Sequence, residues 1–207
     1  MSEKIYQLYL SKSYTEAYYQ LSAEAKKSLW RKAEERVTSS GGKMLLACRS
    51  RWCDETYQSW GVIEYPDIKA VQRVADLDEK DEFFRYAQTQ TLLGLPGDRE
   101  LIPEMSSPDA VYQLYLINHE ADNDEASLSP DVRKRMWAVV MESIDKHGGE
   151  PGLWCHADWS NEEIDVFGIT AWPSVEAVQA HFADMAKIGF HRYVHARTIL
   201  GRRVGAG

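Results

Sequence analysis

The sequence predicts an α+β protein that consists of two fused copies of one β-α-β-β-α-β unit. The string YQLYL occurs at Tyr6–Leu10 and again at Tyr112–Leu116, and matching residues continue at an offset of 107 over about 90 residues. Each copy also shows the same succession of strand-like and helix-like hydrophobic periods. This order of elements is that of a ferredoxin-like fold, so we expect two ferredoxin-like repeats in tandem.

The matches extend through both copies. They include Gly41-Gly42 with Gly148-Gly149, Cys48 with Cys155, Trp52 with Trp159, Gly61 with Gly168 and Pro66 with Pro173. A register of this length does not arise by chance, and the chain is interpreted as a tandem duplication. We expect a first repeat over 1–94, a linker over 95–108 that is rich in Pro, Gly, Ser and charge, a second repeat over 109–201 and a tail over 202–207.

The elements of each copy follow from local signals. A short strand opens each copy (Ile5–Leu10; Val111–Ile117), and a helix follows with Ser22 or Ser129 as its N-cap and a glycine pair at its end. Two strands joined by a polar turn come next, at Lys43–Trp52 and Tyr57–Tyr65 and at Gly152–Trp159 and Glu163–Trp172. A second helix begins after Pro66 or Pro173, and a last strand ends in Leu-Gly.

Charge and composition narrow the class of partner. The net charge of −8 argues against nucleic acid and against an anionic membrane surface, since both need a basic face. The N-terminus has no long apolar run and no signal-peptide pattern. The three cysteines have no paired spacing, and Cys48 and Cys155 occupy equivalent apolar positions, so we expect buried free thiols and a cytoplasmic protein.

The unit, with VIEYPDIKAV crossing from the third strand to the second helix, resembles the dimeric α+β barrel superfamily. This superfamily includes antibiotic-biosynthesis monooxygenases, EthD-like and YCII-like proteins, polyketide cyclases and haem-handling members. The resemblance covers both repeats, and its motif is an aromatic-Pro pair at the end of the third strand. It implies that two units pair through their sheets, so a tandem copy is expected to form an intrachain pseudo-dimeric α+β barrel, as a monomer or a homodimer.

The alternation of side chains along a strand predicts which residues line the barrel. On the second strand, the shared apolar residues (Met44, Leu46, Cys48; Leu153, Cys155) are expected to pack under the helices. The other parity is expected to face the cavity, with Arg49 and Arg51 from the first copy and Trp154, His156 and Asp158 from the second. The third and last strands add Trp60, Glu64, Phe167, Gln88, His195 and Arg197.

These residue types suit proton-transfer chemistry. We expect His156 to act as general base or acid with Asp158 as its orienting partner, and Arg49 and Arg51 to clamp an anion. The other predicted residues (Trp154, Trp60, Phe167, Glu64, Gln88, His195 and Arg197) are expected to bind the substrate. The leading hypothesis is an enzyme without cofactor or metal, an isomerase, cyclase, lyase or monooxygenase, acting on a small aromatic or carbonyl-bearing metabolite.

Three alternatives stay open at this stage. The charged residues of the second strands can be structural ion pairs and nothing more. The chain can be a haem protein of the same architecture, because a haem site needs only one axial histidine and an apolar pocket, and His181 on the second helix is a candidate. It can also be a non-catalytic small-molecule binding or interaction module.

Overall fold

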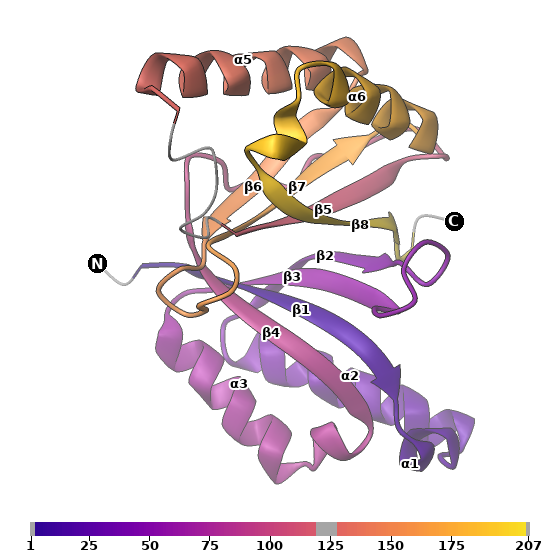
Figure 1. Ribbon diagram of the computed structural model, residues 1–207. Helices are drawn as coiled ribbons and strands as arrows, with labels where there is room; N and C mark the ends of the chain where they lie inside the picture. The colour runs from indigo at the N-terminus through magenta and orange to yellow at the C-terminus, as the bar shows by residue number, and fades with distance from the viewer. Residues whose placement is uncertain (1–2, 119–127, 206–207) are drawn as a thin grey trace. The chain divides into compact units, whose positions relative to one another are not determined.

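The computed structural model describes residues 3–118 and 128–205. The chain divides into two compact units, Met1–Pro96 and Gly97–Gly207. Each unit is a four-stranded antiparallel sheet with its long helices on one face (Figure 1). The chain is therefore α+β and built from two ferredoxin-like units. The last two residues of the predicted tail, 206–207, lie outside the described residues.

The first unit has the strand order β4-β1-β3-β2. Its elements are β1 (Ile5–Tyr14), α1 (Glu16–Tyr19), α2 (Ala23–Ser39), β2 (Lys43–Arg49), β3 (Ser59–Tyr65), α3 (Ile68–Lys80), the 3-10 turn η1 (Phe83–Arg85) and β4 (Ala87–Pro96). The hydroxyl of Ser22 accepts from the amide of Ala25 and caps α2, as predicted. Gly41 takes a positive φ of 82° after the helix, a conformation that favours glycine.

The second unit repeats this order as β8-β5-β7-β6. Its elements are β5 (Val111–Asn118), α5 (Pro130–Lys146), β6 (Glu150–His156), β7 (Val166–Trp172), α6 (Val175–Lys187), the 3-10 turn η2 (Phe190–Arg192) and β8 (His195–Arg203). Ser129 caps α5 through the amide of Val132, and Gly148 has a φ of 69°. The N-caps and glycine stops predicted from the repeat are confirmed in both units.

The helices of each unit cover one face of its sheet with an apolar core. In the first unit this core includes Val37 of α2, Ile63 and Tyr65 of β3, and Val74 of α3. The second unit has a larger core of the same kind, which includes Val140, Ile144, Val166, Trp172, Val178 and Met185. Among the described residues, no helix is long and apolar enough to span a bilayer.

The structure corrects the predicted faces of β2. Ile63 faces the helices, and Met44 pairs with Ile63, whereas Leu46 pairs with Val62 on the opposite face. Leu45 is the extra residue of a β-bulge, which reverses the alternation of all later residues of the strand. The shared apolar residue Leu46 therefore points away from the helices, together with Cys48, and the prediction that they pack under the helices is wrong.

The same shift occurs in β6. Pro151 pairs with Thr170 and Trp154 pairs with Gly168, so one extra residue lies between them. Trp154 packs with the helix-side core of this unit, and His156 pairs with Val166 of that core. The predicted placement of Trp154 and His156 on the face away from the helices is wrong, for the same physical reason as in β2.

Candidate functional site

A cavity of about 130 Å³ lies inside the second unit, between α5, α6 and the helix-covered face of its sheet. Its walls come from both helices, from all four strands, from η2 and from the segment that precedes β5. Most of the lining is apolar and aromatic, with a few polar groups that include His181 and Arg99. A concave apolar site with few polar groups is typical of a small-molecule or cofactor site.

Aromatic rings form one side of this cavity. Trp137 of α5 contacts Trp154 of β6 edge to face, with ring centroids 6.2 Å apart, and contacts Phe190 in the same way at 5.5 Å. Tyr115 of β5 lies 5.8 Å from Trp154. Such ring contacts stabilise an aromatic wall on this side of the cavity.

His181 of α6 is the buried imidazole in the wall of the cavity. It is 7% exposed, and its Nδ1 lies 3.0 Å from the hydroxyl oxygen of Ser143 on α5. Its ring centroid lies 5.0 Å from that of Trp172. Among residues 3–118 and 128–205, no hydrogen-bond partner is found for its Nε2. One ring nitrogen is thus fixed by the protein while the other remains available.

Burial lowers the pKa of His181 to about 4, and the nearby charges of His147 and His191 act in the same direction. Asp184, which pairs with Lys146, His147 and Lys187, acts in the opposite direction, but its effect is smaller than that of burial. His181 is therefore neutral near pH 7. A neutral imidazole is the form that binds a metal ion.

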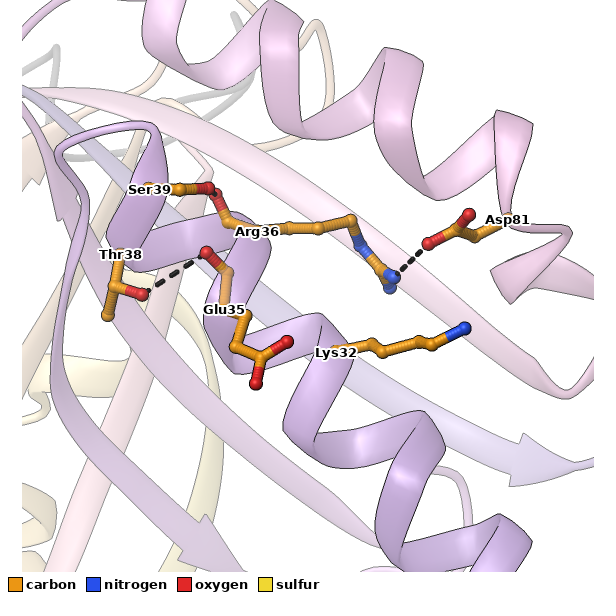
Figure 2. Close-up of a pocket in the computed structure, with 6 residues that line it drawn as sticks. All are labelled: Lys32, Glu35, Arg36, Thr38, Ser39 and Asp81. Atoms are coloured by element: carbon orange, nitrogen blue, oxygen red, sulfur yellow. Dashed lines mark hydrogen bonds and ion pairs between the residues drawn. The ribbon is translucent and has the colours of Figure 1, made fainter.

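In the first unit an ion pair joins the two long helices. Arg36 occupies the position of Ser143 and reaches from α2 toward the end of α3 (Figure 2). Its Nε lies 2.7 Å from Asp78 and its Nη1 2.9 Å from Asp81, and its guanidinium lies over the ring of Phe83 at 5.5 Å. Arg36 also borders an open surface depression together with Lys32, Glu35, Thr38, Ser39 and Asp81. Because Arg36 is already held by two carboxylates, this depression is less suited to a ligand than the second unit's cavity.

The four residues predicted to be catalytic lie at the ends of β2 and β6. Arg49 and His156 are the last residues of these strands, and Arg51 and Asp158 lie in the turns that follow. All four are exposed. Arg49 lies near the hydroxyl of Tyr14, where its charge opposes the rise in pKa that burial causes. Their proposed roles in proton transfer and anion binding stay predictions.

The residues predicted to bind substrate are distributed more widely. Trp154 lines the cavity of the second unit. Trp60 and Phe167 are fully buried on the faces away from the helices, as their strand phase predicted. On those faces Glu64 accepts from Tyr6 and pairs with Lys4 at 3.2 Å, and Gln88 accepts from Ser13. His195 and Arg197 lie on the corresponding face of β8 and are exposed.

Sequence reasoning missed Ser143 and Arg99 and gave His181 little weight. The signal was present in the repeat, because His181 aligns with Val74 and Ser143 with Arg36, while Met185 aligns with Asp78. Comparison of the helices, and not only of the strands, would have indicated that the second copy lost an ion pair and gained a histidine.

Comparisons with known proteins show which solved structures have a similar fold. No family model and no curated protein matches the sequence. The structure is similar to chlorite dismutase from Candidatus Nitrospira defluvii in complex with imidazole, with a TM-score of 0.77 and 10% identity over 98% of this chain and 92% of that one. A double mutant of the same enzyme gives a TM-score of 0.76 at 11% identity, with the same coverage. A further structure, assigned provisionally as chlorite dismutase TA0507, gives 0.70 at 14% identity over 99% and 96% of the two chains.

These matches bear on two expectations. The structures compared above are chlorite dismutases, so the resemblance to antibiotic-biosynthesis monooxygenase, EthD-like or YCII-like proteins is not confirmed. Chlorite dismutases are haem proteins, which overturns the prediction of a protein without cofactor and leaves cofactor-independent chemistry without support. The chain has a duplicated ferredoxin-like α+β fold that is similar to the fold of these chlorite dismutases.

Proposed function

We propose that the chain is a haem-binding protein whose haem site is the cavity of the second unit, where His181 would hold the iron. The single observation that carries the proposal is the buried, neutral imidazole in an aromatic cavity, with one ring nitrogen held by Ser143. The similarity to chlorite dismutases supports the choice of haem over other cofactors.

The histidine donor and the apolar character of the lining fit a haem, but the volume of the cavity does not fit it without side-chain movement. Haem iron is commonly held by one histidine in an apolar pocket, and His181 is the buried histidine of this cavity. The volume is smaller than the roughly 300–1,000 Å³ of most ligand pockets. Space for a macrocycle therefore has to come from movement of the aromatic side chains, among them Trp137 and Trp154, which form one wall.

Each residue of the site has a role that follows from its position. Ser143 fixes the orientation of the His181 ring through Nδ1, which leaves Nε2 as the nitrogen that can bind a metal ion. Trp137, Trp154 and Phe190 exclude water from the cavity. Bound haem would supply redox chemistry at its iron, so an enzyme acting on a small oxygen-containing substrate is the activity that we infer.

The test is titration of the purified full chain with hemin, followed by the Soret absorption band. We expect the wild-type chain to bind hemin with a shifted Soret band, and we expect His181→Val to lose that shift. Valine is the residue that the first unit carries at this position, as Val74, so the variant is compatible with the fold. Circular dichroism at pH 7 checks that the variant is folded.

Two matched variants make the assignment specific. His191→Ala removes the other histidine that lines the cavity, and Val74→Ala changes the counterpart position of the first unit. Both are expected to keep the Soret shift. Loss of the shift in His191→Ala, with its retention in His181→Val, would show that the axial ligand has been assigned to the wrong residue.

The volume of the cavity favours a second candidate, the binding of one small planar molecule. A cavity of about 150 Å³ holds benzene in other proteins, and this cavity has about 130 Å³. In this case imidazole or phenol would quench tryptophan fluorescence with saturation, while hemin would leave the Soret band at its free position.

A further inference from the structure

Residues 97–103, here called the strap, run alongside β6 and close one side of the cavity. The amide of Gly97 donates to the carbonyl of Trp154 at 2.8 Å, and the amide of Trp154 donates to the carbonyl of Arg99 at 3.0 Å. At the far end of the strap, the hydroxyl of Tyr112 donates to the carbonyl of Pro103 at 3.1 Å. The strap is thereby fixed against the second unit.

The backbone of the strap approaches β6 closely because two glycines leave room. A Cβ on Gly97 would collide with the ring of Trp154, and a Cβ on Gly152 would collide with Pro103. These two close approaches, together with the hydrogen bonds at Trp154, determine where the side chain of Arg99 begins. That side chain then lines the cavity.

The guanidinium of Arg99 has no carboxylate partner in the part of the chain that the structure describes. The hydrogen bond found for it runs from Nη2 to the sulfur of Met141 at 3.9 Å, a weak acceptor. Asp98, which precedes Arg99 in the sequence, is exposed and forms no ion pair with it within the described residues. A partly buried guanidinium usually has an anionic or strong neutral acceptor, because burial of an unpaired charge is costly.

Two further observations place this charge at the interior of the site. Arg99 opposes the rise in pKa that burial causes at the hydroxyl of Tyr115, so the guanidinium lies within electrostatic reach of that ring. Tyr115 and Met141 both line the cavity, next to the aromatic wall. The cavity thus combines flat apolar walls with one cation on its strap side.

We propose that Arg99 recognises a carboxylate carried by a planar aromatic ligand in this cavity. This inference rests on the proposed function in that it takes the cavity as the ligand site, but it concerns the chemistry of the ligand and not the axial histidine. The carboxylate can belong to a haem propionate or to a free aromatic acid, and Arg99 would donate two parallel hydrogen bonds to either.

The experiment compares ligands of the same ring system with and without a carboxylate. Benzoate and benzamide are titrated into the full chain and followed by tryptophan fluorescence and calorimetry, because Trp137 and Trp154 line the cavity. Hemin and hemin dimethyl ester form the second arm. We expect benzoate to bind at least tenfold more tightly than benzamide, or hemin at least tenfold more tightly than its ester, and we expect Arg99→Met to remove the difference.

Two further variants keep the result interpretable. Arg99→Lys retains the charge without the planar donor pair and is expected to restore part of the preference. Arg133→Met, at an exposed position of α5, is the matched control and is expected to keep the full preference for the carboxylate ligand. A thermal melt of each variant shows whether the fold is intact.

The outcomes separate this inference from the proposed function. If hemin fails to bind but benzoate binds in an Arg99-dependent way, the haem proposal fails and the role of Arg99 is supported. If hemin binds through His181 and Arg99→Met changes neither arm, the role of Arg99 is overturned and the haem proposal stands. Equal affinity of acid and neutral ligand in both arms of the wild-type titration also overturns it.

Discussion

The two units have the same elements in the same order, but they differ in what joins their helices and in the space beneath them. In the first unit Arg36 of α2 reaches Asp78 and Asp81 at the end of α3. In the second unit the aligned residues are Ser143, Met185 and Ile188, and a cavity that Met185 helps to line lies between α5, α6 and the sheet. The duplicated fold thus keeps its frame while one copy is stabilised by an ion pair and the other can admit a ligand.

Some of the differences between the units lie on the helix-covered side. Trp154 replaces Ala47 on the second strand and His181 replaces Val74 on the second helix. The shared residues Leu46, Cys48, Leu153 and Cys155 lie on the opposite face of these strands and are all buried. On the second strands, the buried residues of that face are therefore shared while Ala47 and Trp154 differ.

The largest expected effect follows from removal of the ion pair in the first unit. Arg36→Met would leave the partly buried Asp78 without its cation, and burial already raises the pKa of that carboxyl. Loss of one partner from a buried pair costs about 3–5 kcal/mol. Since Asp78 and Asp81 keep some exposure, we expect a loss of about 2–4 kcal/mol in the free energy of unfolding, measured by urea denaturation.

The control for this prediction is Arg31→Met, which removes an exposed pair with Glu35 on the same helix. Exposed pairs contribute about 0–1 kcal/mol, so a small change is expected. Equal losses in the two variants would mean that Arg36 does not stabilise the first unit as described.

A smaller effect is expected from acid in the second unit. The pKa of His181 is lowered to about 4, below its usual value of 6.5, so the unfolded chain takes up the proton first as the pH falls. His181 therefore has no differential effect above about pH 6.5 and destabilises the fold progressively between pH 6.5 and 4. In the His181→Val variant, the decrease in the free energy of unfolding that acid causes should be smaller by about 1–3 kcal/mol.

Urea denaturation of both proteins at pH 7.5, 6 and 5 provides the measurement. The stability difference between wild type and His181→Val should shift in favour of the variant as the pH falls. A difference that stays constant over this range would contradict the neutral state of the buried imidazole.

Most of the fold was predictable from the repeat, since strand order, the N-caps Ser22 and Ser129 and the glycine stops depend on local signals that occur twice. The faces of the second strands were not predictable. The bulge at Leu45 adds one residue to the strand, and the residue types around it do not mark its position. All later side chains of the strand then point to the opposite face. The prediction of the cavity residues on these strands assumed that side chains alternate regularly between the two faces.

The site itself depends on contacts that sequence patterns do not record. That His181 is buried against Ser143 follows from the packing of α6 on α5, and the alignment with Val74 and Arg36 indicates it only indirectly. The position of Arg99 depends on the path of the strap along β6, which the composition of the predicted linker did not reveal.

The most direct test of the account is hydrogen–deuterium exchange of the full chain with and without hemin, at a hemin concentration that saturates the Soret change. The account predicts slower exchange in α5 and α6, where the cavity lies, and unchanged exchange in α2 and α3, which Arg36 joins through Asp78 and Asp81. Slower exchange in α2 and α3 with no change in α5 and α6 would contradict the assignment of the ligand site to the second unit.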